Sequence, residues 1–473
     1  MNRFSYFSSY FWSFANSGGA QIVGFLSTIL IARIASPADF GLIAICSSIV
    51  LISNILSEAG LASTIVANKE FSIKKASTIL VTVGGISILL FCVIVGFSSE
   101  LANFFQQSRV AEILPFMALT ILANGFRCVH IAVLIRRLEF KKLTLISIIS
   151  VSMGSSIGVA AAYLHEPLIG LVLVFILTPI ISTVILWIYA PWGFYFYFKP
   201  RLLYSDIGFS LNVSLSSFLD QGSKAMLVFL LNGRFGIVDL GFYSRADAIK
   251  NLTSQTIDKV VQRVSFPVLS KKNHDSPDDA TNEHIKISVA LASILIPLTY
   301  FIFSHPESII YMLYGPNWVE SAFILKKIVF VGLFVTLTSQ NLTLFKALGY
   351  PKLMTWNKGI ALLLLPCIFV LIDSPHILDI LNGIVIYNIA LFIISFMSLS
   401  LLSPTHMINY LKYVFCMSMF SLGIILAHYF IFSMLFENIY FNLVFNGLSL
   451  CGLMCFFYYG LFLLSKGFKN VKG

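Results

Sequence analysis

Residues 21–45 read QIVGFLSTILIARIASPADFGLIAI, and residues 221–245 read QGSKAMLVFLLNGRFGIVDLGFYSR. The two stretches align without a gap at a spacing of 200 residues, and both begin with glutamine. Both also carry an Asp-apolar-Gly word, at positions 39–41 and 239–241. In each copy an apolar run long enough to cross a bilayer leads to this word, and a second run follows it. The pattern predicts an internal repeat in which an apolar span runs outward, turns at the Asp-apolar-Gly word and returns.

The composition of the whole chain excludes a water-soluble fold. Hydrophobic residues make up 58% and charged residues 11% of the 473 positions, and the mean hydropathy is +0.89. Average globular chains carry about 25% charged residues, so this chain has too little polar surface to stay dissolved. The formal charge of +10 could suggest nucleic acid, but the basic residues fall in short clusters between apolar runs. We expect no nucleic-acid partner.

Apolar runs of about 20 residues, bounded by charge, proline or glycine, predict an all-α integral membrane protein with about fourteen transmembrane helices. The spans are expected at about 12–32, 40–62, 76–97, 113–135, 143–164, 168–190, 207–232, 241–266, 285–304, 318–347, 353–373, 376–402, 413–434 and 440–465. The repeat then divides the chain into a first six-helix bundle at 1–200 and a second at 201–404. Residues 405–473 are expected to add two helices and a cytoplasmic tail.

The distribution of basic residues predicts the orientation of these spans. With the amino terminus inside, the expected outer loops carry only Arg33, Arg109 and Arg234, while the inner segments carry all the other basic residues that lie outside the spans. This bias follows the positive-inside rule and predicts that both termini are cytoplasmic. The first span lacks a small-residue cleavage pattern, so we expect it to be retained.

The sequence offers no pattern for a cofactor or a metal. All 7 cysteines fall in expected spans, no glycine-rich phosphate loop occurs, and the 8 histidines are scattered. We therefore expect no disulfide framework, no metal site and no bound cofactor.

Ionisable residues inside the expected spans are the candidate functional residues, because each costs at least about 2.5 kcal/mol near the bilayer centre. They are confined to a subset of spans, which predicts one shared aqueous cavity. Basic residues outnumber acidic ones there, so the cavity should attract a large, amphipathic anion. The candidates for substrate binding are Arg127, Lys224, Arg245, Lys250, Lys259 and Arg263. The candidates for ion coupling are Asp220, Asp258 and Glu58.

Each candidate also has a structural interpretation. Asp220 and Lys224 are four residues apart, so they can pair on one helix face and neutralise their own burial. The polar positions between Asn251 and Gln262 recur at helical spacing and form one face, which either lines a cavity or packs against another helix. Arg127 could donate a structural hydrogen bond. The lysines nearer span ends could extend to the interface, namely Lys326, Lys327 and Lys346.

Several words along the chain are similar to those of a known family. They are LIARIASPADFGLIAI at 30–45, EAGLASTIVANKEFS at 58–72, FGIVDLGFYSRADAI at 235–249, RVSFPVLSKK at 263–272, LYGPNWVESAFILK at 313–326 and FKALGYPK at 345–352. In this order they resemble the polysaccharide transporter family, the Wzx-type repeat-unit flippases of the multidrug/oligosaccharidyl-lipid/polysaccharide exporter superfamily.

The resemblance implies a fourteen-helix fold like that of multidrug and toxic compound extruders. It also implies export of undecaprenyl-pyrophosphate-linked oligosaccharides across a bacterial inner membrane, for O-antigen, capsule or exopolysaccharide assembly. Membrane lipid, a polymerase and other assembly proteins are the implied partners. A cationic central cavity is expected in the family, and the residues here in comparable spans are Arg127, Lys224 and Arg245.

Two other functions stay open at the level of sequence. An ion-coupled multidrug exporter of the same fold would need a cavity in which acidic residues dominate. A membrane-embedded polymerase or glycosyltransferase would need catalytic side chains and a sizeable outer loop, and the sequence predicts neither, so we expect no enzyme. Coupling to a proton or a sodium ion through Asp220 or Asp258, or transport driven by membrane potential alone, is compatible with the sequence.

Overall fold

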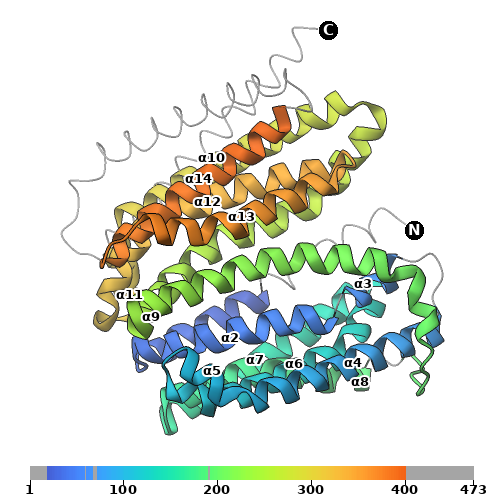
Figure 1. Cartoon of the computed structure of the whole chain (residues 1–473), viewed down its shortest axis with the longest axis horizontal. Helices are drawn as coiled ribbons and strands as arrows, with labels where there is room; N and C mark the ends of the chain where they lie inside the picture. Colours follow the sequence, from blue (N-terminus) through green and yellow to red (C-terminus); the bar gives the residue numbers. More distant parts are fainter. Residues whose placement is uncertain (1–18, 59, 68–71, 190–191, 401–473) are drawn as a thin grey trace. The chain divides into compact units, whose positions relative to one another are not determined.

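The computed structural model describes residues 19–58, 60–67, 72–189 and 192–400, and every regular element in these ranges is a helix (Figure 1). The long helices are α2 (Pro37–Glu58), α4 (Ile73–Gly96), α6 (Ser108–Arg136), α7 (Phe140–Leu164), α8 (Pro167–Tyr189), α9 (Ile207–Asp275), α10 (Pro277–Ser304), α12 (Val319–Ala347), α13 (Pro351–Leu371) and α14 (Ile377–Ser400). The short ones are α3 (Leu61–Ala67), α5 (Ser98–Phe104), α11 (Pro306–Tyr314) and the 3₁₀ turns η1 (Pro200–Asp206) and η2 (Pro316–Trp318).

The described part of the chain contains 10 helices long and apolar enough to cross a membrane, together with a shorter apolar helix at Gly19–Ala32. They coincide with the first twelve expected spans, because α9 covers two of them. The last two expected spans, at 413–434 and 440–465, lie outside the described residues, as does the start of the first. The total of about fourteen helices therefore stays a prediction, while the all-helical membrane fold is confirmed.

Helix α9 shows where the predicted turn was wrong. Its apolar part, Ser210–Lys259, has 50 residues, which corresponds to about 75 Å of helix, against about 30 Å for the hydrocarbon core. The helix is interrupted at Gly236, whose φ of 85° and ψ of 179° suit glycine and not other residues. The break thus lies three residues before Asp239, and the Asp-Leu-Gly word belongs to the helix that follows.

The first copy of the word is likewise part of a helix, because its aspartate caps the start of α2. The Asp39 carboxylate accepts hydrogen bonds from the Ser36 backbone N–H at 2.9 Å and from the Ser36 hydroxyl at 2.7 Å. The Asp39 backbone N–H donates in turn to the Ser36 hydroxyl oxygen at 3.3 Å. These reciprocal bonds form a capping box, which satisfies donors that the first helical turn leaves unpaired. Asp-apolar-Gly is therefore a helix-start signal in this chain.

Replacement of Ser36 by alanine should lower the free energy of unfolding by about 1 kcal/mol, the usual value of an N-cap side chain. Ser47→Ala is the matched control in the same helix, because the Ser47 hydroxyl donates only to the Ala44 carbonyl of its own helix. Thermal unfolding in detergent measures the stability of both purified variants. Equal melting temperatures for the two variants would contradict the cap.

The two copies of the word also contact each other. A Cβ added to Gly41 would lie 2.1 Å from the Ile237 carbonyl oxygen, and one added to Gly241 would lie 1.8 Å from the Pro37 carbonyl oxygen. Residues 37 and 237, like 41 and 241, are equivalent positions of the repeat. Contacts in which equivalent residues exchange roles are the signature of a two-fold axis. The structure therefore supports the repeat and its 200-residue register at this point.

The order of long and short helices repeats as well. Within the described ranges, α5 precedes α6 in the first copy, and α11 precedes α12 in the second. If Gly19–Ala32 counts as the first apolar helix of the first copy, and the two parts of α9 as the first two of the second, each short helix lies between the third and fourth apolar helices of its copy. The two copies therefore resemble each other beyond residues 21–45, where the sequence shows the repeat.

The chain divides into two compact units, Met1–Arg245 with Lys358–Ile377, and Ala246–Asn357 with Leu378–Gly473. In the described part of the first unit, α4 and α6 enclose a core that includes Val83 and Val129. In the second unit, α9, α10 and α12 enclose a core that includes Leu344. The expected division into bundles at 1–200 and 201–404 remains a proposal.

Candidate functional site

The first group of candidate residues lies where α2 ends beside α6. Glu58 and Arg127 are both half-buried, and their charges interact electrostatically without a direct ion pair. His130, one turn beyond Arg127, is buried between the rings of Trp187 at 4.7 Å and Trp192 at 5.7 Å. The histidine thus belongs to an aromatic core, whereas Glu58 partly compensates the charge of Arg127.

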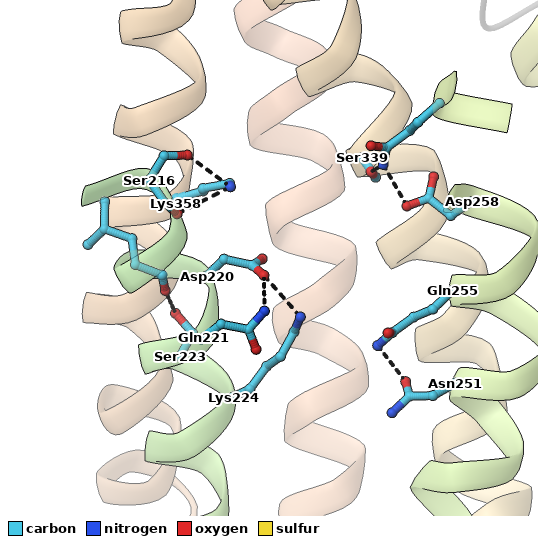
Figure 2. Close-up of polar contacts among 12 residues, drawn as sticks. Ser216, Asp220, Gln221, Ser223, Lys224, Asn251, Gln255, Asp258, Ser339 and Lys358 are labelled. Carbon is cyan, nitrogen blue, oxygen red and sulfur yellow. Dashed lines mark hydrogen bonds and ion pairs between the residues drawn. The ribbon is translucent and has the colours of Figure 1, made fainter. Parts of the chain in front are cut away.

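The second group follows one face of the first part of α9. Asp220 and Lys224 form the predicted ion pair, with 3.0 Å between Oδ2 and Nζ, and Gln221 donates to the same oxygen at 3.1 Å (Figure 2). Both side chains of the pair are about half exposed. One turn earlier, Ser216 accepts a hydrogen bond from Lys358 of α13 at 3.1 Å. The face therefore carries two ammonium groups on either side of one carboxylate.

Lys358 is a residue that the sequence analysis did not select. It lies inside α13, which begins at position 351, and it is half-buried against the first part of α9. From the sequence it counts as one of the inner basic residues that set the orientation. The expected span 353–373 already placed Lys358 five residues inside a membrane helix, and this position could have identified it as a candidate.

Arg245 makes a different kind of contact. Its guanidinium carbon lies 3.9 Å from the centre of the Phe40 ring, a close cation–π arrangement in which the charge is held over the aromatic face. Both residues belong to the repeated stretch, and Phe40 is buried in α2. The contact holds the guanidinium beside the place where the two copies of the repeat meet.

The third group is the polar face of the second part of α9. The Lys250 ammonium pairs with Asp247 at 2.5 Å, Asn251 donates to the same carboxylate at 2.6 Å, and Gln255 donates to Asn251 at 2.9 Å. Figure 2 shows the bond between Asn251 and Gln255. The predicted polar face is thus connected by hydrogen bonds along the helix.

Asp258 continues this face and connects it to α12. Its carboxylate accepts hydrogen bonds from Gln262 at 2.8 Å and from Gln340 at 2.9 Å, and Gln262 also donates to Ser339. The carboxylate is therefore held by amide donors from two helices. Lys259 is exposed beside it. The last candidate of this helix, Arg263, has a side chain outside the described part of the structure.

Of the three lysines for which the sequence left two interpretations open, Lys326 and Lys346 have exposed side chains near rings, and Lys327 is half-buried. The Lys326 ammonium lies 5.4 Å from the Phe303 ring centre, and that of Lys346 lies 4.7 Å from the Phe266 ring centre. This arrangement fits side chains whose stems follow apolar surface and whose charges reach water. Among the described residues, no three His, Cys, Asp or Glu side chains are grouped as metal ligands.

Comparisons with known proteins agree with this architecture. The sequence model of a family described as polysaccharide biosynthesis protein matches residues 30–323. The succinoglycan biosynthesis transport protein ExoT of Rhizobium meliloti (strain 1021) is 23% identical over 73% of this chain and 70% of its own length. The lipopolysaccharide biosynthesis protein WzxC of Escherichia coli (strain K12) is 21% identical over 66% of this chain and 63% of its own length.

Two solved structures have the same fold. The lipid II flippase MurJ in its inward closed conformation superposes with a TM-score of 0.76, at 15% identity, over 96% of this chain and 99% of that one. An inward-facing multidrug resistance transporter of the MATE family superposes with a TM-score of 0.59, at 14% identity, over 83% and 96% of the two chains. At these identities the likeness concerns the fold alone.

Proposed function

Because this chain belongs to the family of polysaccharide biosynthesis proteins, we propose that it is a flippase that exports lipid-linked oligosaccharides across a membrane. It is a multi-pass membrane protein, and its matched relatives include a transport protein of succinoglycan biosynthesis and WzxC. We assign it to the bacterial inner membrane, with both termini in the cytoplasm. The substrate proposed is an oligosaccharide on undecaprenyl diphosphate.

The observation that carries this proposal is the set of positive side chains on membrane-spanning helices of a family member. Arg127, Lys224 and Arg245 lie on α6 and α9, and Lys358 adds a fourth on α13. Cations at such depth are costly unless an anion or water compensates them. Glu58 and Asp220 compensate Arg127 and Lys224 in part, and a diphosphate would add to that compensation, whereas an organic cation would be repelled by the excess of positive charge. The balance of charges thus favours the flippase over a multidrug exporter of the same fold.

The proposed mechanism is alternating access. The two halves rock about a central site, the diphosphate and sugars cross beside the cationic side chains, and the polyprenyl tail remains in lipid. Withdrawal of the tail would cost about 0.8 kcal/mol for each exposed CH₂ group. Outward movement of the anionic head is favoured by about 2.3 kcal/mol per charge for each 100 mV of inside-negative potential. The membrane potential can therefore drive export, and Asp220, Asp258 or Glu58 are the candidates for a coupled ion.

Reconstitution of the purified chain tests the proposal. Vesicles are loaded with undecaprenyl diphosphate-linked oligosaccharide, and a membrane-impermeant glycosidase reports how much sugar reaches the opposite leaflet. We expect transfer to be faster than in protein-free vesicles and to increase with an imposed potential. Ethidium uptake without sugar transfer would establish the multidrug exporter instead. Growth of the oligosaccharide into polymer would establish an enzyme.

A further inference from the structure

The side chains of Asp247, Asn251 and Gln255 form a ladder along the second part of α9, which we call the amide ladder. Its members are spaced by four residues, so they stand one above another on the helix surface. Asn251 Nδ2 donates to Asp247 Oδ2 at 2.6 Å, and Gln255 Nε2 donates to Asn251 Oδ1 at 2.9 Å. All three residues are half-buried and lie within one structural unit. The ladder is therefore a continuous, ordered array of polar groups.

The ladder retains capacity to bind a ligand. Each side-chain amide nitrogen has two N–H groups, and the bonds that the described residues make use one at Asn251 and one at Gln255. The Gln255 Oε1 oxygen accepts no bond from a described residue, and it is not sealed from solvent. Because each bond polarises the next, the carboxylate at one end makes that oxygen a stronger acceptor. The free end of the ladder thus offers both donors and an acceptor.

The charge of the ladder is already compensated. Lys250 pairs with Asp247 at 2.5 Å, and the Lys250 side chain is 12% exposed. A phosphate approaching Asn251 and Gln255 therefore meets neutral amides beside a neutralised carboxylate. In the first part of α9, by contrast, the side chain of Lys224 is half exposed, so its charge is open to a ligand. The ladder suits an uncharged ligand with many hydroxyl groups, since a hydroxyl both donates and accepts a hydrogen bond as an amide does.

The packing of α12 determines which side of α9 the ladder occupies. Gly332 of α12 approaches Ser254 and Lys250, where an added Cβ would lie 3.0 and 3.3 Å from their side chains. Successive residues of a helix are turned by about 100°, so Asn251 and Gln255 border this packed strip without being covered by it. Partly exposed amides beside an ion pair cannot face hydrocarbon without a large cost. Contact with water or with a polar ligand is therefore favoured over contact with lipid.

We propose that the amide ladder recognises the sugar part of the transported lipid, by hydrogen bonds from Asn251 and Gln255 to sugar hydroxyl groups. This inference rests on the proposed function and assigns the uncharged part of its substrate to particular residues. The diphosphate is held by the cationic side chains. Recognition of sugar and recognition of phosphate are therefore separable by substitution.

Two lipids serve as probes for a binding experiment with the full chain in lipid nanodiscs. One is undecaprenyl diphosphate without sugar, and the other is the sugar-loaded carrier extracted from cells that lack this protein. We expect the unmodified protein to bind the loaded lipid more tightly than the bare one. In the double variant Asn251→Leu with Gln255→Met, this preference should fall by about tenfold, as expected for the loss of two or more hydrogen bonds. The affinity of this variant for the bare lipid should stay within about twofold of that of the unmodified protein.

Two further variants control this test. Gln255→Met alone leaves the bond between Asp247 and Asn251 intact, so it reports on sugar even where the double variant is unstable. Thr253→Val removes a hydroxyl that donates only to carbonyls of its own helix, and it should keep the full preference. Equal weakening of both lipids in the Gln255 variant, or an unchanged preference, would overturn the sugar assignment. So would an unmodified protein that binds both lipids equally. Failure of the unmodified protein to bind either lipid would overturn the proposed function itself.

Discussion

Alanine at Gly241 is expected to lower the free energy of unfolding by about 3 kcal/mol or more and to abolish transport. The added Cβ would lie 1.8 Å from the Pro37 carbonyl oxygen, far inside contact distance. A main-chain atom cannot turn away as a side chain can, so the two helix starts must separate. Overpacking in a well-packed interior costs about 1–3 kcal/mol, and a backbone clash stands at the upper end. Thermal unfolding in detergent and the vesicle assay measure the two effects.

The repeat supplies a second variant for the same test. Gly41→Ala should cause a comparable loss, since its Cβ would lie 2.1 Å from the Ile237 carbonyl oxygen. The control is Gly85→Ala in α4, where an added Cβ meets nothing within 4 Å. That substitution should be neutral or stabilising by about 0.5–1 kcal/mol, because alanine favours helix over glycine. Similar melting temperatures for Gly85→Ala and Gly241→Ala would show that the close approach is not required.

Neutralisation of three cations together should reduce sugar transfer at least about 100-fold. The variant carries Arg127→Gln, Lys224→Gln and Arg245→Gln, and it is expected to enter the membrane in normal amounts. Each charge-assisted hydrogen bond to phosphate contributes about 1.5–3 kcal/mol, so three together account for such a loss. Transfer of the sugar-loaded lipid is measured in vesicles, and the amount of folded protein is measured by size-exclusion chromatography.

A matched variant removes the same number of positive charges elsewhere. Lys326→Gln, Lys327→Gln and Lys346→Gln should leave transfer nearly unchanged, because Lys326 and Lys346 are exposed beside aromatic rings. Because both variants have the same total charge, a difference between them reports binding at the three sites and not a general attraction of anions. Full transfer by the first variant would remove Arg127, Lys224 and Arg245 from the binding site.

Much of the helical architecture could be predicted from hydropathy alone, since a bilayer crossing has a fixed length. The ion pair of Asp220 with Lys224 and the polar face that starts at Asn251 were also predictable, because both follow from spacing on one helix. The exact turn was not predictable in this way. The aspartate of the repeated word was interpreted as a turn residue, although its spacing from Ser36 also fits a capping box, and the bond seen in the structure decides between the two.

Partners from distant parts of the chain account for what the sequence missed. Asp258 is held by Gln340, which is 82 positions away, and no pattern in a single sequence marks such a contact. Lys358 looked like a charge at a membrane boundary, whereas the packing of α13 on α9 places it against Ser216. Local spacing thus predicts which face of a helix is polar, and tertiary packing decides what that face meets.

The meeting of Gly41 with Ile237 and of Gly241 with Pro37 joins main chain to main chain. Apart from the two glycines, such a contact places almost no requirement on the neighbouring side chains. Substitutions can accumulate on the remaining surfaces of both duplicates while the contact keeps its shape. The contact therefore constrains the shape of the fold without constraining the chemistry of the surfaces around it.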